Sequence, residues 1–247
     1  MIRALKFFTM ALIKLSSIGI TNLSGKAGGS VFAHNRGGNY IRNFVVPSNP
    51  KTALQAAARA AFGALSSAWR SLTQEARNAW KEAATSFPYI NRLGDQKIMS
   101  GLNLYVSLNR NLGVIGQPSI DMPPIPQGVD GVASVEMTAQ SSAAGVLAAL
   151  NAPAVLQGNE EATTIFAVYA TPPLAAGIGY AENKLRLLTT KSETQVTEGD
   201  YVTDYEENFT VSVPVGSKIF LAIDPINQNT GERGARVIVS AVVTESA

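Results

Sequence analysis

The sequence predicts an α+β protein with several units: an extended N-terminal arm with a β-hairpin, a three-helix unit and an antiparallel β-sandwich. Two observations lead to this prediction. Apolar residues recur at the helical spacings of three and four between residues 49 and 112, and at the strand spacing of two from Val132 onward. Between these stretches, residues 113–131 contain four prolines among small and polar residues, a composition typical of an extended linker at a domain boundary.

Residues 1–48 form the predicted arm, in which short alternating segments are interrupted by glycine. We expect residues 30–34 and 40–45 to pair as a hairpin across residues 35–39, because asparagine and glycine tolerate the positive backbone angles of a tight turn. The arm has too few apolar residues for a core of its own. It must therefore lie either on its own helices or on a neighbouring subunit.

The first thirteen residues superficially resemble a secretory signal, with Arg3 and Lys6 before a short apolar run. Lys14 interrupts this run, and no small-residue cleavage site follows it. About seven apolar residues are also too few for a membrane span, which needs roughly 20. We therefore expect either a simple extended arm or a functional start at Met10, and no membrane partner.

Residues 49–112 predict three helices. We expect the first to open at Asn49-Pro50, as an N-cap followed by a proline at the first helical position. Thr73 separates it from a second helix, and a third should run from Leu102 to Leu112 and stop at Gly113. The first two helices carry alanine-rich apolar stripes that suit close packing, at Leu54, Ala57, Ala58, Ala61, Leu65, Ala68, Trp69 and Leu72, and at Ala76, Ala79, Trp80, Ala83 and Ala84.

Residues 132–247 predict seven short strands with no helical pattern between them, which favours an antiparallel sandwich. Tyr201 and Tyr205 precede one of these strands, where either could serve as a structural corner tyrosine. The architecture resembles immunoglobulin and fibronectin type III modules, although the Cys-Trp-Cys signature is missing. The predicted strands are 133–139, 144–150, 163–171, 180–190, 209–213, 218–224 and 236–243.

The net charge of +2 hides a strong asymmetry between the two halves of the chain. Residues 1–112 hold 14 Lys and Arg against 3 Asp and Glu, a net charge of +11. Residues 113–247 hold the remaining 6 basic and 15 acidic residues, a net charge of −9. A basic front and an acidic rear predict either an anionic partner for the first half or a head-to-tail contact with another copy of the protein.

The composition excludes several kinds of active site. The chain has no cysteine, which rules out disulfides, thiol catalysis and cysteine-bound metal, and His34 is its single histidine. The glycine-rich runs at 25–29 and 36–38 lack the spacing of nucleotide-binding loops. We expect no catalytic residue, metal, cofactor or small-molecule substrate. Calcium is an alternative, without the Asp-x-Asp-x-Asp-Gly loop that would support it, at Glu160, Glu161, Asp200, Asp204, Glu206, Glu207 and Asp224.

Basic residues of the arm and the helices are the candidate docking residues, because guanidinium groups suit interfacial ion pairs with acidic neighbours. Together with Phe32, Trp69 and Trp80 they could alternatively contact nucleic-acid phosphates and stack on bases. The tryptophans share faces with the alanine stripes, however, and this favours a core position for them. The predicted docking residues are Arg36, Tyr40, Arg42, Arg59, Arg70 and Arg77.

The segment between residues 24 and 112 contains, in order, the motifs Gly28-Gly29 with Phe32, Arg36-Gly37-Gly38-Asn39-Tyr40-Ile41-Arg42, Pro47-x-Asn49-Pro50-x-Thr52-x-x-Gln55, Leu65-Ser66-x-x-Trp69-x-x-Leu72-Thr73 and Ser100-Gly101-Leu102-Asn103-Leu104-Tyr105-Val106. This order of motifs resembles a group of small structural proteins of tailed bacteriophages. The resemblance implies a component of the virion, and it implies no catalytic residues.

The leading hypothesis is a non-enzymatic virion structural protein, either an auxiliary capsid protein or a ring component of the head-to-tail neck, assembled in the bacterial host cytoplasm. Its partners would be capsid, portal, neck or tail proteins and other copies of itself. One alternative is a virion protein that contacts packaged DNA through the basic half. Another is an adhesin whose sandwich binds a receptor or glycan, with Tyr169, Tyr180, Tyr201 and Tyr205 as candidate contacts.

Overall fold

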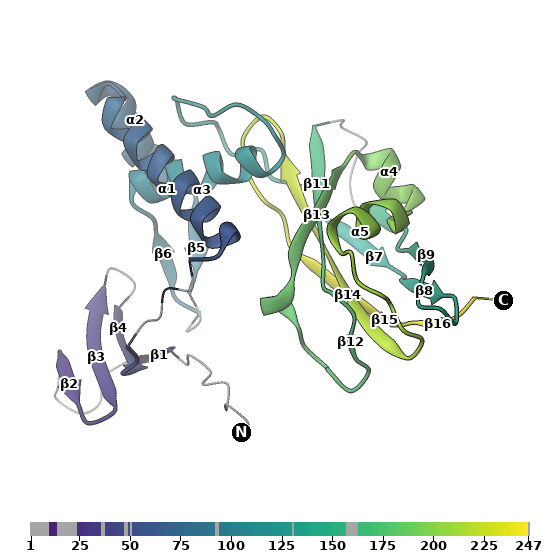
Figure 1. Ribbon diagram of the computed structural model, residues 1–247. Helices are drawn as coiled ribbons and strands as arrows, with labels where there is room; N and C mark the ends of the chain where they lie inside the picture. The colour runs from purple at the N-terminus through teal and green to yellow at the C-terminus, as the bar shows by residue number, and fades with distance from the viewer. Residues whose placement is uncertain are drawn as a thin grey trace.

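The computed structural model describes residues 10–13 as backbone alone, and residues 24–35, 38–46, 49, 51–91, 94–129, 131–156 and 163–246. Helices and antiparallel sheets are both present, which confirms the predicted α+β class. Figure 1 shows three regions in chain order: a small sheet, a group of three helices and a larger sheet with short helices beside it.

The arm forms a four-stranded antiparallel sheet in the order β1 (Met10–Ile13), β4 (Gly38–Asn43), β3 (Ser30–Asn35) and β2 (Gly25–Ala27). The predicted hairpin is confirmed, since β3 and β4 pair antiparallel across residues 36 and 37, which lie outside the described residues. None of the described side chains of residues 24–46 is buried. The sheet therefore has strand pairing without a core, as its composition predicts.

The helical unit contains α1 (Ala53–Ser71), α2 (Gln74–Ala83) and α3 (Gly101–Val114). Thr73 caps α2 as predicted, by accepting a hydrogen bond from Ala76 N. The predicted opening of α1 is wrong, because Thr52 is its N-cap and Asn49 lies outside the helix. The predicted stop of α3 at Gly113 is also wrong: the helix runs one residue past this glycine.

Between α2 and α3, the chain forms a 3-10 turn, η1 (Ala84–Ser86), and a short hairpin of β5 (Pro88–Ile90) and β6 (Gln96–Ile98). The sequence pattern predicts no strand between these two helices. The strands are three residues each, too short to leave an alternating pattern that could be read in advance.

The core of the helical unit is built on aromatic residues. Trp80 and Tyr105 are fully buried and meet edge to face, with ring centroids 5.3 Å apart, and Trp69 lies 5.4 Å from the same tyrosine ring. The indole Nε1 of Trp80 donates a hydrogen bond to Asp121 O at 2.7 Å. Trp80 is thus a core residue, and this removes it from the alternative in which it stacks on nucleic-acid bases.

The proline-rich segment after α3 is held against that helix. Asn109 Oδ1 accepts a hydrogen bond from Ile120 N at 2.6 Å, and Asn109 Nδ2 donates to Ile120 O at 3.2 Å. Both amide atoms of one buried side chain therefore fix the backbone of a residue eleven positions away. This bonding sets the path of the chain from α3 towards the larger sheet.

The main sheet of the C-terminal unit is antiparallel. Its order is β13 (Arg186–Lys191), β11 (Thr164–Ala170), β14 (Ser217–Asn227) and β15 (Val237–Val242), and β12 (Leu174–Ala175) also pairs with β14 beyond the end of β11. Residues 221–223 of β14 pair with β11 on one edge and with β15 on the other. β14 is therefore the central strand of this sheet.

A second layer packs on the inner face of the main sheet. It contains β7 (Val132–Val135) paired with β10 (Ala154–Leu156), and β8 (Thr138–Ser141) paired with β9 (Leu147–Asn151) and, in parallel, with β16 (Thr244–Glu245). Two short helices, α4 (Glu193–Glu198) and α5 (Val202–Asn208), complete the layer (Figure 1). One apolar cluster joins these elements to the inner side chains of β11 and β14.

Two strand predictions and one prediction about helices fail in this region. Residues 209–213 form no strand, the predicted strand at 180–190 begins only at Arg186 after a 3-10 turn, η2 (Glu182–Lys184), and the expected absence of helices is wrong. The signal for α4 was present in the sequence, because Ser192 and Gln195 form a capping box and Gly199 ends the helix in the left-handed conformation.

The C-terminal end of α3 packs on the outer face of the main sheet. Leu112 and Ile115, at the end of α3, pack in one buried cluster with Ala167 of β11 and Ile226 of β14. Gly231 follows β14 with φ of +73°, and a methyl group there would collide with the carbonyl oxygen of Leu108 in α3. The close approach of these two backbones docks the end of α3 on the sheet, and Ala167 and Ile226 are buried in the contact.

Candidate docking surface

The apolar stripe of α1 is covered along only half of its length. Leu65, Ala68, Trp69 and Leu72 are partly buried and pack on the core of the helical unit. The same stripe continues towards the N-terminus, where every residue from 53 to 60 is exposed. We call residues 53–62 the free half of α1; its large apolar side chains are Leu54, 67% exposed, and Phe62, 59% exposed.

The free half of α1 lies in the most basic part of the chain. No acidic residue precedes Glu75, so the arm and α1 carry basic charge alone. Among the described residues, Arg42, Arg59 and Arg70 are exposed and take part in no ion pair. Their guanidinium groups are thus available to an acidic partner.

Four of the six predicted docking residues fall into two groups, while Arg77 lies apart on α2 and Arg36 lies outside the described residues. Tyr40 and Arg42 lie two positions apart on β4 and so share one face of the arm sheet. Arg59 and Arg70 lie on one side of α1, eleven residues or about 16 Å apart along the axis.

Two of these arginines make local contacts. Arg59 donates from both terminal nitrogens to Asn49 Oδ1, at 3.0 and 3.1 Å, and Arg70 Nε donates to Ser66 O at 3.2 Å. Arg77 lies on α2 and is half-buried, with its Nε lacking a hydrogen-bond acceptor among the described residues. Arg59 therefore lies on the free half of α1, whereas Arg70 lies near the C-terminal end of the same helix and Arg77 lies on α2.

The acidic charge of the C-terminal unit is concentrated on α4 and α5. Residues 192–217 contain no Lys or Arg. Lys191, just before them, pairs with Asp204 at 2.6 Å, and its charge offsets only one carboxylate. The acidic residues of this surface are Glu193, Glu198, Asp200, Asp204, Glu206 and Glu207.

An apolar groove of about 310 Å³ lies beside α5. Phe209 and Val213 are almost fully buried in it, whereas Val146 and Val211 on its walls are 60% and 54% exposed. Glu206 is also part of its lining. We call this feature the α5 groove. The sequence does not predict it, because its alternating pattern at residues 209–213 favours a strand, which the structure does not contain.

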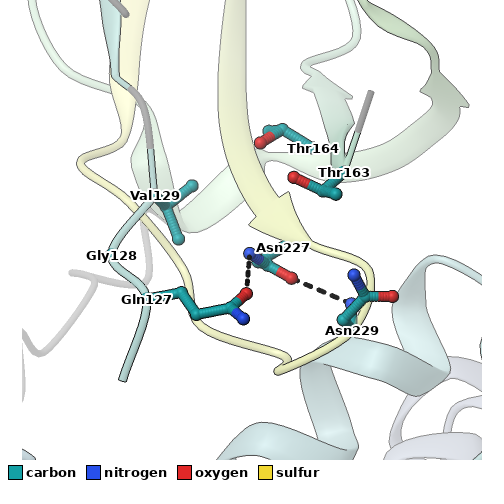
Figure 2. Close-up of a pocket in the computed structure, with 7 residues that line it drawn as sticks. All are labelled: Gln127, Gly128, Val129, Thr163, Thr164, Asn227 and Asn229. Carbon is teal, nitrogen blue, oxygen red and sulfur yellow. Dashed lines mark hydrogen bonds between the residues drawn. The ribbon is translucent and has the colours of Figure 1, made fainter. Parts of the chain in front are cut away.

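A larger cavity, about 590 Å³, lies where the proline-rich segment meets the ends of β11 and β14 (Figure 2). Its described lining consists of amide, hydroxyl, glycine and valine residues, without an ionisable or aromatic side chain. Asn227 bridges the two segments by donating to Gln127 Oε1 at 3.4 Å, and its own Oδ1 accepts from Asn229 N at 2.9 Å within the turn after β14 (Figure 2). The described lining thus offers hydrogen bonds but no ionisable side chain that could act as a general acid or base.

Asp224 is the most completely enclosed carboxylate described, at 0% exposure, and it is bound by arginine. Arg236 donates from Nε and Nη2 to its two oxygens at 2.7 and 2.6 Å, and Arg233 donates at 3.1 Å. The hydrogen bond to Asp224 raises the pKa of Arg236, whose guanidinium also lies 4.9 Å from the Tyr169 ring centroid. Both oxygens of Asp224 are thus bound by arginine, which removes this residue from the calcium alternative.

The remaining acidic candidates give no metal site among the described residues, where no group of three His, Cys, Asp or Glu side chains could hold an ion. Glu160 and Glu161 lie outside those residues.

Two of the four tyrosines considered as glycan contacts are core residues. Tyr201 and Tyr205 are buried, and burial raises the pKa of both phenols. The Tyr205 hydroxyl donates to Thr171 O at 2.9 Å, a structural role like the one predicted for a corner tyrosine, although Tyr205 lies in a helix. Tyr180 is exposed and its hydroxyl donates to Glu182.

None of the described helices is both long enough and apolar enough to cross a bilayer. No protein-family model, curated protein or solved structure matches this chain. The basic, half-covered front and the acidic rear with its groove are therefore the features from which a function can be argued.

Proposed function

We propose that this chain is a non-enzymatic structural protein of a tailed-bacteriophage virion, an auxiliary capsid or head-to-tail neck component. It docks onto neighbouring virion proteins through its basic N-terminal half. The observation that carries this proposal is the uncovered front: a sheet without a buried described side chain, followed by a helix that leaves half of its apolar stripe in solvent.

Such a front is unfavourable for a solitary protein. Removing apolar surface from water is favourable by roughly 25 cal/mol for each Å². A helix with an exposed apolar face therefore gains free energy when a partner covers that face. Extended basic arms gain in the same way when they lie on an acidic assembled surface. The C-terminal unit then projects from the docking point as a module similar to immunoglobulin or fibronectin type III domains.

The test follows the chain into particles of the phage or prophage that encodes it. We expect the full chain to remain with virions through density-gradient purification, and a variant lacking residues 1–48 to be depleted at least tenfold from them. Comparable solubility of the two proteins before assembly is the control. Full-length chain that stays entirely in the soluble fraction while virions form normally would overturn the proposal.

Binding of packaged DNA is a second candidate, favoured by the exposed arginines without ion pairs on β4 and α1. Phosphate contacts release counterions, so DNA retention should fall by orders of magnitude between 50 and 200 mM salt. A triple variant with glutamine in place of Arg42, Arg59 and Arg70 should lose the retention of DNA. Absence of retention even at 50 mM salt would eliminate this candidate and leave protein docking.

A further inference from the structure

We propose that the free half of α1 in one copy of this chain docks into the α5 groove of a second copy. This docking rests on the proposed function, because it specifies how copies of a virion component join to each other. Three features support it: the apolar face of the helix, the apolar groove with acidic surroundings, and the positions of the two surfaces on opposite sides of the main sheet.

The helix face has the spacing that grooves recognise. Leu54, Ala58 and Ala61 lie on one stripe at intervals of four and three, and Phe62 lies beside it. Leu54 and Phe62 are about 12 Å apart along the helix axis. The alanines between them leave the helix narrow, so its backbone can approach a partner closely while the two large side chains act as anchors.

The α5 groove offers an apolar floor to such an anchor. Phe209 and Val213 form a buried base, at 4% and 2% exposure, and Val146 and Val211 extend into solvent above it. An aromatic side chain inserted between the two exposed valines would remove all three from water. Phe62 is the described aromatic residue of the free half that can do so.

The charges around the two surfaces are complementary. Arg59 lies on the free half of α1, and no acidic residue lies near it in sequence, since the first is Glu75. Glu206 lines the groove and Glu207 follows it on α5, in a stretch without basic residues. Opposite charges favour this pairing and orient it, whereas two fronts or two rears would repel each other.

The helix cannot reach the groove of its own chain. The helical unit packs on the outer face of the main sheet, through Leu112 and Ile115 of α3. The layer that contains α5 packs on the inner face of the same sheet (Figure 1). With the sheet between them, the occupant of the groove is a second copy, and the contact is head to tail, of the kind that closes into a ring or continues as a filament.

The absence of cysteine makes disulfide capture a direct test. Phe62 and Val211 are both exposed, so the variants Phe62→Cys and Val211→Cys should each fold. Mixed in equal amounts and oxidised, the two proteins should give a disulfide-linked dimer in at least tenfold higher yield than a mixture of Ser67→Cys with Val211→Cys. Ser67 is the matched control because it is exposed on the same helix, about 140° around from Phe62.

Charged variants test the polarity of the contact. Phe62→Glu blocks the helix and Val211→Glu blocks the groove, so each protein alone should be monomeric by light scattering at concentrations where the unmodified chain forms multimers. Their mixture should form dimers and nothing larger, because one intact helix and one intact groove remain. Circular dichroism of both variants checks that they are folded.

Equal cross-linking of Phe62→Cys and Ser67→Cys would overturn the docking, as would multimers that persist in Phe62→Glu or a mixture that stays monomeric. Binding of duplex DNA to the chain that is lost in Phe62→Glu, without cross-linking to Val211→Cys, would overturn it in favour of a nucleic-acid partner. The proposed function fails separately: copies that cross-link through this contact but are missing from virions would refute only the virion assignment.

Discussion

Replacing Asp224 with alanine should lower the free energy of unfolding by about 3 kcal/mol. The carboxylate is fully buried on β14 and accepts three hydrogen bonds from Arg233 and Arg236. Removing one partner of a buried ion pair costs about 3–5 kcal/mol, because the other charge is left without compensation. The arginine side chains are 38% and 21% exposed and can recover some hydration, so the lower end of that range applies.

The matched control is Glu182→Ala, which removes the other carboxylate bound to Arg236. Glu182 is 44% exposed and its oxygen lies 3.5 Å from Arg236 Nη1. Exposed ion pairs contribute about 1 kcal/mol or less, so this substitution should have a small effect. Both variants keep Arg236 itself, and the difference between them therefore reports the buried carboxylate together with its three hydrogen bonds.

Equilibrium unfolding in urea, followed by circular dichroism, measures both changes. A loss of about 3 kcal/mol corresponds to more than a hundredfold shift of the folding equilibrium. The reasoning would be refuted if Asp224→Ala and Glu182→Ala lost the same amount, or if Asp224→Ala lost less than about 1 kcal/mol. Either result would mean that the enclosed carboxylate contributes no more than a surface ion pair.

Three further predictions concern the junction with α3 and the buried tyrosines. Gly231→Ala should cost about 2–3 kcal/mol in urea unfolding, because of left-handed backbone strain and a collision with α3. Gly216→Ala is the control: Gly216 has a similar φ but open space around it, and the substitution should cost about 1 kcal/mol. Equal losses would argue against close docking of α3 on the sheet. Tyr205→Phe should cost about 1 kcal/mol, because it removes the hydrogen bond to the carbonyl oxygen of Thr171. Tyr201→Phe should change stability by less than about 0.5 kcal/mol, because the Tyr201 hydroxyl has no partner among the described residues. The reverse order of the two losses would contradict this bonding. Burial raises the pKa of both tyrosines above the ordinary value near 10, so the contribution of their neutral forms to stability is fully present below pH 10. The free energy of unfolding in urea should therefore fall as the pH rises from 10 to 12. A free energy that stays constant over this range would count against their burial.

Local patterns predicted several elements correctly. Asparagine and glycine between two short alternating segments identified the hairpin of β3 and β4, and Thr73 identified the start of α2. These features depend on backbone angles and hydrogen bonds within a few residues, which a sequence states directly. The missed helix α4 belongs to the same class, because its capping box at Ser192 and its C-terminal Gly199 were readable.

The candidate surfaces were predictable only in part. Eight recurring apolar residues predicted the apolar stripe of α1, and the count of charged residues predicted its basic surroundings. The sequence could not tell which turns of that stripe α2 and α3 would cover, since periodicity identifies an apolar face but not the length of its partner. The exposure of Leu54 and Phe62 is therefore a finding of the structure.

The sequence by itself determined the α+β class, the change from helical to strand spacing near residue 131, the lack of thiol chemistry and the division into a basic front and an acidic rear. Tertiary structure alone decided that the end of α3 packs on the outer face of β11 and β14, on the side of the main sheet opposite the layer that contains α5 and its groove. The unbroken apolar run of β11, residues 165–170, was compatible with burial on both faces. Which element supplies the second cover depends on contacts between residues more than 50 positions apart, such as Leu112 with Ala167, and these are fixed by packing of the whole chain.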